Sequence, residues 1–388
     1  MYIAILGRQP ALGMAELEHL YGDTNTRWFS DEAALISTDS FSINYLGGTQ
    51  KTGRIVVELA KANWHSTSMK IVQTYTTKWL EAEGKITFGI SAYGFDVSSR
   101  EVQKTGIILK QKLKKIGVNM RLLPNIEPAL NTATSHHNKL GLADNKVELL
   151  VIRSRDGKVI IAESVGAQNI TAYSRRDQER PKRDAFVGML PPKLAQIMIN
   201  LARPQSATGR ILDPFCGTGV IMQEAALMKY SVYGTDLSEK MIRYTRDNLN
   251  WLQDTHHTVF DWYLHEGDAM DTNWQSPIDA VVCEGYLGQP FSAPPSTAKL
   301  DQVRKNCDHI TTAFLKNIAK QIIPGTPLCI AIPAWRNQTG QFTHLPLTTQ
   351  LEALGYKEFE FHNVKRRDLL YYREGQVVAR ELLVLVKS

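Results

Sequence analysis

The stretch RILDPFCGTGV, residues 210–220, decides how we interpret the second half of this chain. Its apolar start predicts a buried strand that ends at Asp213, and the residues after Gly219 predict a helix. Two glycines, Gly217 and Gly219, let the backbone turn tightly and approach a ligand closely. In open α/β sheets, ligands bind in the crevice beyond the carboxyl ends of the strands. The stretch therefore predicts a ligand-binding turn between a strand and a helix.

Strands and helices alternate around this turn from Pro191 onward. We expect strands at 210–215, 231–236, 262–269, 279–284 and 327–333, and helices at 191–202, 218–228, 238–252, 296–321 and 345–355. Ser238 is expected to cap its helix. Such alternation predicts the α/β class, with a mostly parallel sheet that is covered by helices on both faces. A terminal hairpin at 365–387 predicts at least one antiparallel strand in that sheet.

The sequence pattern of the first half of the chain predicts smaller α+β units. We expect domains at 1–65 and 66–168, a basic linker at 169–186, and the α/β domain at 187–388. The second unit contains a basic helix at 99–116 and a hairpin that turns at Asp156 and Gly157. A length of 388 residues suits two or three such domains.

Composition excludes several classes of protein. No apolar stretch reaches the roughly eighteen residues that a membrane span needs, and the first residues lack the pattern of a signal peptide. The four cysteines form no CxxC pair and have no histidine spaced for zinc, so we expect a reducing, cytoplasmic setting and no metal. The net charge of +6 fits either a solvated surface or a phosphate-rich partner.

Acidic residues follow three successive predicted strands, at Asp213, Asp236 and Asp268. A carboxylate at Asp236 suits the two hydroxyls of a ribose, and Asp268 lies within reach of an adenine edge. The dinucleotide fingerprint GxGxxG is incomplete, because its third glycine position holds Met222. A carboxylate at Asp213 would repel a diphosphate but suits an amino-bearing cofactor. The pattern favours S-adenosyl-L-methionine over a dehydrogenase-like or purely structural domain.

The motif DPFCGTG, residues 213–219, resembles the first motif of class I methyltransferases that act on exocyclic amines of nucleic acids. Residues 173–202 resemble the linker and lead-in helix of THUMP-domain tRNA guanosine-N2 methyltransferases, the Trm11 and archaeal Trm-G10 group. Residues 130–151 are similar to the THUMP segment of that group, and residues 1–18 to its N-terminal ferredoxin-like domain. The resemblance therefore covers nearly the whole chain, in the same order.

This resemblance implies an RNA methyltransferase that acts on the N2 amine of a tRNA guanosine. The first two domains would bind tRNA, and a protein partner stays open. S-adenosyl-L-methionine would be held by residues of the turn and of the strand ends: Asp213, Phe215, Gly217, Gly219, Asp236, Asp268 and Ala269.

The fourth motif departs from the family. There, a strand ends in Asp-Pro-Pro-Tyr, in which the acid accepts hydrogen bonds from the target amine and the aromatic ring stacks on the base. This chain has Glu284, Gly285 and Tyr286 instead, without the prolines and with the aromatic residue one position closer to the acid. The resemblance implies catalytic roles for Glu284 and Tyr286. Glu284 is one methylene longer than aspartate, and Gly285 permits the backbone to retreat.

Several alternatives stay open at this point. One alternative is a silent RNA-binding protein that keeps the cofactor pocket, and another is an N6-adenine or N4-cytosine methyltransferase. A third is that Glu284 is only a solvated residue at the end of a strand. Cys283 suggests thiolate chemistry on a pyrimidine ring, but successive strand residues face opposite ways, so only one of Cys283 and Glu284 faces the pocket. For Cys283 and Cys216 we expect small apolar packing.

Three basic clusters indicate contact with RNA phosphates, and with it a steep salt dependence of tRNA affinity. They lie in the helix at 99–116, in the linker and at 365–367. The residues that we expect to bind RNA are Lys110, Lys114, Arg175, Arg176, Arg180 and Lys182.

Overall fold

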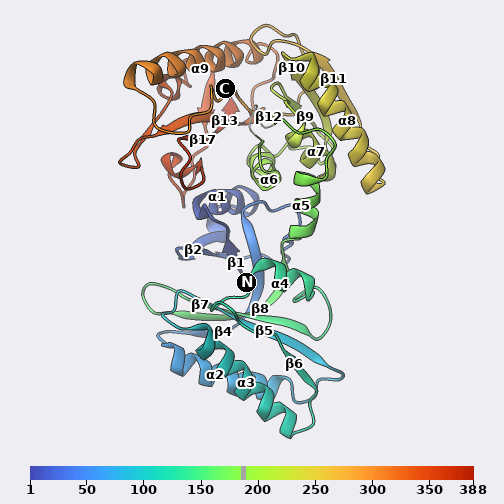
Figure 1. Cartoon of the computed structure of the whole chain (residues 1–388), viewed down its shortest axis with the longest axis vertical. Coiled ribbons are helices and arrows are strands. Elements are labelled where there is room, and N and C mark those ends of the chain that lie inside the picture. The colour runs from blue at the N-terminus through green and yellow to red at the C-terminus, as the bar shows by residue number, and fades with distance from the viewer. Residues whose placement is uncertain (185–188) are drawn as a thin grey trace. The chain divides into compact units, whose positions relative to one another are not determined.

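The computed structural model describes residues 1–184 and 189–388, so the boundary expected between 186 and 187 lies outside the described residues. The chain divides into two compact units (Figure 1). The first contains residues 1–44 and 48–172, and the second contains residues 45–47 and 173–388. None of the described helices is long and apolar enough to cross a membrane.

The N-terminal unit is built on a single sheet of eight strands in the order β2-β3-β1-β4-β8-β7-β5-β6. Its strands are β1 (Tyr2–Leu6), β2 (Thr26–Ser30), β3 (Ala33–Ile36), β4 (Thr49–Leu59), β5 (Ile86–Tyr93), β6 (Met120–Leu122), β7 (Lys146–Arg153) and β8 (Val159–Ala167). Its helices are α1 (Pro10–Tyr21), α2 (Trp64–Lys78), α3 (Ser99–Lys115) and α4 (Thr132–His137). Strand β4 pairs with β1 and with β8, so this sheet runs through both of the N-terminal domains that the sequence predicts.

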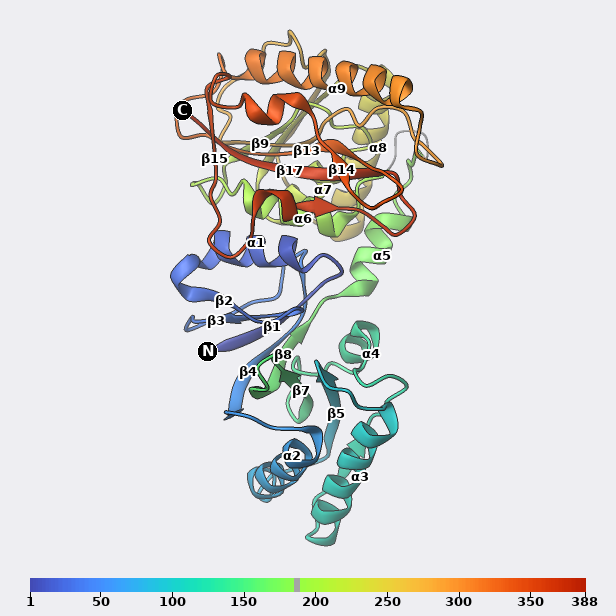
Figure 2. The same cartoon turned by 90° about the vertical axis from the view of Figure 1, so that its left-hand side faces the viewer.

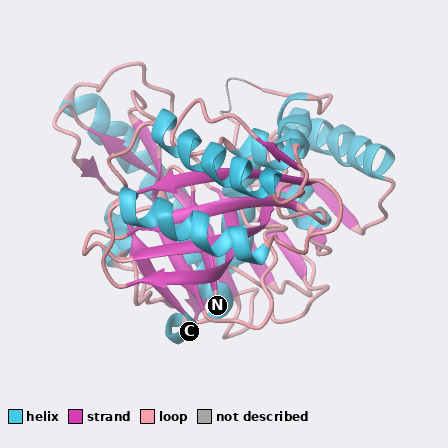
Figure 3. Cartoon of the chain, turned by 90° about the horizontal axis from the view of Figure 1, so that it is seen from below, coloured by secondary structure: helices cyan, strands magenta, loops and turns pink. Residues whose placement is uncertain are grey.

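Helix α3 shows why its sequence forms a helix. The side chain of Ser98 accepts from the backbone N–H of Glu101, and the Glu101 carboxylate accepts from the N–H of Ser98, which closes a capping box. Its apolar positions are buried with those of α2 over β5 and β7. The two helices lie side by side in Figure 2, and Figure 3 shows the chain coloured by secondary structure, with helices lying over strands. The helix predicted at 99–116 is confirmed.

The C-terminal unit has a second sheet, with the main order β11-β10-β9-β12-β13-β17-β15. Its strands are β9 (Arg210–Asp213), β10 (Ser231–Asp236), β11 (Trp262–Glu266), β12 (Ala280–Glu284), β13 (Pro327–Arg336), β14 (Phe342–Thr343), β15 (Tyr356–Glu358), β16 (Leu370–Tyr371) and β17 (Val378–Lys387). Its helices are α5 (Ile170–Gln178, which begins at the end of the first unit), α6 (Pro192–Leu201), α7 (Val220–Leu227), α8 (Glu239–His256) and α9 (Thr297–Ile318).

Strands β9 to β13 are parallel, and β17 runs antiparallel between β13 and β15. The predicted α/β class and the antiparallel terminal strand are therefore confirmed. From β9 the chain builds outward to β10 and β11, then returns to the other side of β9 with β12. This reversal is a topological switch point, where open α/β sheets bind ligands.

Three local features differ from the expectation. The helix expected at 345–355 is only a short 3-10 turn at Pro346–Thr349, because the hydroxyls of Thr348 and Thr349 bond to nearby carbonyl oxygens and compete with a helix. The expected linker contains helix α5. Ser238 precedes α8, but its side chain does not cap the helix.

Candidate active site

A cavity of about 900 Å³ opens at the carboxyl ends of β9, β10 and β12. It is the size of a pocket that encloses a small organic ligand. Among its lining residues are most of those that the sequence singles out: Asp213, Phe215, Gly217, Asp236, Asp268, Ala269, Glu284 and Tyr286. Gly219 is not part of the lining, although its neighbours on both sides are.

Gly219 instead shapes the turn between β9 and α7. Its φ of +79° is left-handed, and a Cβ atom there would lie 2.7 Å from Cγ2 of Thr245. Thr245 also donates a hydrogen bond to the carbonyl oxygen of Gly217, and Asn248 donates one to Thr218. Glycine is needed at 219 because both the backbone and the space exclude a side chain.

Thr245 and Asn248 were missed by the sequence reasoning. Both are fully buried polar side chains on α8, and the turn they hold lies nearly thirty residues upstream. Their spacing of three places them on one helix face beside the buried Leu249. A pair of polar residues on the apolar face of a helix was the available signal.

The missing third glycine is compensated on the neighbouring strand. In the dinucleotide fingerprint, that glycine allows close packing of helix against strand. Here Met222 of α7 packs on Gly234 of β10, where a Cβ atom would lie 2.3 Å from the methionine sulfur. The glycine that permits the close approach therefore lies on the strand.

The buried acids make the floor of the cavity electronegative. Asp213 is 2% exposed, and its Oδ1 accepts from the N–H of Phe215 at 3.2 Å. Burial raises the pKa of Asp213 well above its ordinary value; the Phe215 N–H opposes this shift, and the charges of Asp236 and Glu284 add to it. Such a site favours a ligand that carries positive charge.

Asp236 fixes the turn as well as facing the cavity. Its Oδ2 accepts from the N–H of Gly217, and its Oδ1 from the N–H of Ser238, both at 2.9 Å. Each oxygen keeps a further lone pair for a ligand hydroxyl. Burial raises the pKa of Asp236, and the two N–H donors oppose that shift.

Two of the residues that are predicted to bind the cofactor, Asp268 and Ala269, follow the end of β11. Asp268 follows the end of that strand, and its Oδ1 accepts from the N–H of Met270 at 2.9 Å. The buried Ala269 also lines the cavity. On the β9 side, the ring of Phe215 makes an edge contact with Phe314, with 5.3 Å between ring centroids. These residues supply an apolar wall beside the acids.

Glu284 at the end of β12 is paired with a residue that the sequence did not suggest. Arg380 of β17 donates from Nε to Oε1 of Glu284. The two side chains are only 14% and 10% exposed, for Glu284 and Arg380 respectively, so Glu284 is not a solvated strand end. Burial raises the pKa of Glu284, whereas the Arg380 charge lowers it.

The residues after Glu284 form the rim of the cavity. The N–H of Gly285 donates to the carbonyl oxygen of Ala331 at 2.9 Å and keeps the chain on β13 for one more residue. Tyr286 then lines the cavity with 42% of its surface exposed. An exposed aromatic ring at the rim is available to stack on a flat ligand.

The cysteines are unsuited to nucleophilic attack. Cys283 is fully buried in the core on the opposite face of the sheet from Glu284, and Cys216 is 5% exposed. Burial raises the pKa of both thiols well above the ordinary value. The thiolate that such chemistry requires is disfavoured at both positions.

The predicted RNA-binding residues separate into two groups. Lys114 and Arg175 are exposed, and Lys110 and Lys182 are half-buried. Arg176 and Arg180 are buried, which corrects their expected role. Arg176 donates to both carboxylate oxygens of Glu224, at 2.6 and 3.1 Å, so its charge is used inside the fold.

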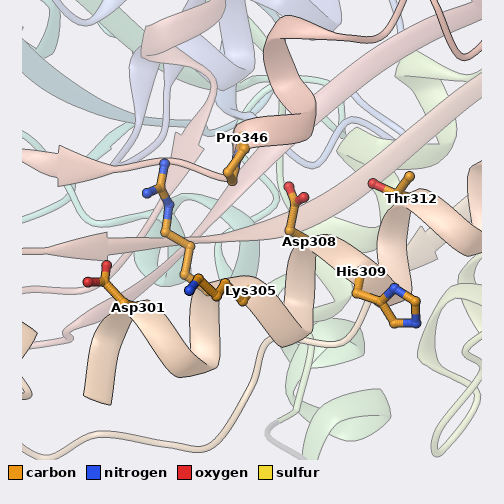
Figure 4. A pocket seen from close by; sticks show the side chains of 7 residues that line it. Asp301, Lys305, Asp308, His309, Thr312 and Pro346 are labelled. Carbon is orange, nitrogen blue, oxygen red and sulfur yellow. The ribbon is translucent and has the colours of Figure 1, made fainter. Parts of the chain in front are cut away.

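A second hollow, of about 350 Å³, lies on helix α9 beside Pro346 (Figure 4). Asp308 accepts there from the N–H of Leu347, and Arg304 donates to the carbonyl oxygen of His344. These charged groups hold residues 344–347, which follow β14, against α9. In the part of the chain that the structure describes, no three His, Cys, Asp or Glu side chains gather to hold a metal ion.

Comparison with known proteins agrees with this geometry. The family model described as the RMKL-like methyltransferase domain matches residues 180–338, and a DNA methylase model matches residues 50–247. The tRNA (guanine(10)-N2)-dimethyltransferase of Methanothermobacter thermautotrophicus is 34% identical over 159 residues, which are 40% of this chain and 43% of that protein. The enzyme of the same name from Pyrococcus abyssi is 44% identical over 104 residues, 27% of this chain and 26% of the relative.

The matched segments thus span less than half the length of these two relatives. Among solved structures, TrmN from Thermus thermophilus has a similar fold, with a TM-score of 0.53 and 17% identity over 100% of this chain and 99% of that one. Strand order, glycine turn and strand-end acids define a class I methyltransferase, and both family models describe enzymes that transfer methyl groups. The DNA methylase model covers about half of this chain, so the chain belongs to the methyltransferases, and within them it is similar to the tRNA (guanine(10)-N2)-dimethyltransferases named above.

Proposed function

We propose that this protein transfers a methyl group from S-adenosyl-L-methionine to the exocyclic N2 amine of a guanosine in tRNA. One observation carries the proposal: a single cavity at the switch point brings together Asp213, Asp236, Asp268 and Glu284. The relatives named above, whose printed activity is methylation of tRNA guanine N2, support the choice of substrate.

The residues present fit the cofactor. Asp236 would accept from ribose hydroxyls, Asp268 and Ala269 would meet the adenine, and Phe215 and Gly217 would line the middle of the ligand. Asp213 is buried where its ionised form lacks a cation, and the amino group of the cofactor would supply one. When bound, S-adenosyl-L-methionine supplies an electrophilic methyl group.

Glu284 and Tyr286 would act on the target base. The lone pair of a guanine amine is delocalised into the ring, and a hydrogen bond from its N–H to a carboxylate favours the pyramidal, nucleophilic form. Positioning of that amine against the methyl group supplies much of the rate. Tyr286 at the rim would stack on the unpaired base, an interaction worth about 1–3 kcal/mol.

The N-terminal unit would deliver the tRNA. We propose that it contains the ferredoxin-like and THUMP-type parts, with Lys110 and Lys114 on phosphates, and that Arg175 and Lys182 of the C-terminal unit contact RNA as well. The protein would act in the cytoplasm without a metal.

A silent RNA-binding protein is the second candidate, and the Glu284–Arg380 pair is the observation that favours it. An acid already held by a guanidinium has one oxygen fewer for an amine. The match to a DNA methylase model keeps an N6-adenine or N4-cytosine target as a further candidate, because the amine chemistry is the same.

One experiment separates these candidates. The purified protein is incubated with methyl-labelled S-adenosyl-L-methionine and unmodified tRNA transcripts, and the labelled nucleoside is identified by mass spectrometry. We expect N2-methylated guanosine, which Glu284→Ala abolishes and the exposed Glu374→Ala, on the terminal hairpin, leaves intact. Labelled N6-methyladenosine or N4-methylcytidine would overturn the proposal in favour of an adenine or cytosine target. No label in a protein that binds both ligands would overturn it in favour of a silent RNA-binding protein.

A further inference from the structure

Arg380 reaches Glu284 across an intervening strand. Glu284 of β12 lies opposite Ala331 of β13, and two residues further along β13, Pro333 lies opposite Arg380 of β17. Residues two apart on a strand share a face, so Glu284 and Arg380 project from the same face of the sheet. Ala331 and Pro333, which separate them, are small enough to let the guanidinium pass over β13.

The pair uses only part of the carboxylate. Oε1 accepts from Arg380 Nε, whereas Oε2 accepts no hydrogen bond within the described residues and is not sealed from solvent. Glu284 lines the cavity, and Arg380 does not. Arg380 therefore stands behind Glu284, and the open oxygen is the part of the pair that a ligand can reach.

We infer that Arg380 is a positioning residue, which holds the Glu284 carboxylate by Oε1 so that Oε2 alone faces the cavity and accepts the N–H of the target amine. This inference rests on the proposed function. It assigns to Arg380 the constraint on the carboxylate that the two prolines of the fourth motif would otherwise give. In the family that this chain resembles, a short aspartate is followed by a rigid turn. This chain has a longer side chain before Gly285, so it needs another constraint to hold the carboxylate to about 0.5 Å.

The charges around Glu284 give Arg380 a second effect. Asp213 faces the same cavity from β9, and burial opposes ionisation of Glu284. Arg380 is the opposing charge from β17, while Glu381 beside it is held by Arg366 on the other face of that strand. Loss of Arg380 would raise the pKa of Glu284 and favour its protonated form, which has one acceptor oxygen fewer. The variant would therefore lose acceptor strength as well as the fixed orientation of the carboxylate.

The test compares the pH dependence of methyl transfer to tRNA in the wild type, Arg380→Met and Arg380→Lys. We expect Arg380→Met to reduce the rate about 100-fold at neutral pH, because a misplaced acceptor costs that much. Its acid limb should move up by about 1–3 pH units, and Arg380→Lys should restore part of both changes. Arg373→Met, on the exposed tip of the same hairpin, is the matched control.

Binding of S-adenosyl-L-methionine shows whether each variant is folded, since Arg380 lies outside the cavity. An acid limb that stays in place in a folded Arg380→Met variant would overturn the inference. So would a rate that stays at the wild-type level.

A readout without catalysis separates this inference from the proposed function. The carboxyl carbon of Glu284 is followed by NMR in glutamate-labelled protein and is assigned with Glu284→Gln. Should the wild type methylate no tRNA, the proposed function fails, and this titration alone decides whether Arg380 controls the carboxylate. A titration at lower pH in the wild type than in Arg380→Met supports it; identical titrations overturn it.

Discussion

The hydroxyl of Thr245 on α8 donates a 2.7 Å hydrogen bond to the carbonyl oxygen of Gly217, in the turn that borders the cavity. Thr245 is fully buried, so water cannot take over this bond. The helix after β10 thus fixes the backbone of the turn that follows β9. A side chain that never touches the cavity controls the shape of its floor.

Thr245→Val should therefore destabilise the protein by about 1–3 kcal/mol, because it leaves a buried carbonyl without a donor. Affinity for S-adenosyl-L-methionine should fall as well, since the turn is released. Urea unfolding and calorimetric titration measure the two effects. Thr255→Val, at an exposed position of the same helix, should change neither, and a silent Thr245→Val would refute the role of this bond.

Asp213 should make the stability of the ligand-free protein depend on pH. Its folded-state pKa is raised above the unfolded value, so the unfolded chain releases the proton first as the pH rises. The free energy of unfolding should then fall from about pH 4 upward, by about 1.4 kcal/mol for each pH unit until the folded-state pKa is passed.

Asp213→Asn should remove this slope, raise stability at neutral pH and weaken binding of S-adenosyl-L-methionine. Urea unfolding between pH 4 and pH 8 tests the first two points, and calorimetry tests the third. Asp279→Asn is a less suitable control, because Asp279 accepts from the backbone N–H of Arg210. The exposed Asp254→Asn is the better one, and an equal slope in Asp213→Asn and the wild type would contradict the prediction.

Arg175 and Arg176 are neighbours with opposite expected effects. Arg176→Ala leaves Glu224, whose side chain is 1% exposed, with the neutral Gln196 as donor but without its paired guanidinium, and should destabilise the protein by about 3–5 kcal/mol. Arg175→Ala should leave stability within about 0.5 kcal/mol and reduce tRNA affinity instead. Urea unfolding and tRNA binding are measured for both variants. Equal changes of stability and of tRNA affinity in the two variants would contradict the prediction.

Lys110 and Lys114 should contribute to tRNA affinity through phosphate contacts. Replacing both with alanine should weaken binding of different tRNAs alike and reduce the slope of log affinity against log salt by about 2, one for each lysine. Filter binding over a salt series measures this slope. A matched pair, Lys61→Ala with Lys85→Ala, removes the same charge from exposed loop positions of the N-terminal unit. Equal slopes for the two double variants would argue against a specific role for α3.

The strand-end acids and the glycine turn could be predicted because their signals are local. Asp213, Gly217 and Gly219 lie within one short stretch, and Asp236 follows one strand later. Each strand and helix there carries its own periodicity, so the alternation predicts a parallel sheet without any knowledge of long-range contacts.

The partners of charged residues could not be predicted in the same way. Arg176 lies in a run of basic residues that looks like an RNA-binding surface, and only the packing of α5 on α7 shows that Glu224 neutralises it. Arg380 lies 96 residues after Glu284, and its role depends on the register between β13 and β17. Register is a property of the assembled sheet, which no short motif encodes.

The place of β17 in the sheet has a consequence for biosynthesis. A ribosome adds about 5–20 residues per second. Because Arg380 lies 96 residues after Glu284, it is synthesised about 5–20 s after β12 is complete. During that interval the nascent C-terminal unit has the central strands of its sheet but an acid without its counter-charge. Nascent chains arrested between the two strands should remain protease-sensitive in this unit, and extrusion of β17 should be the step at which resistance appears.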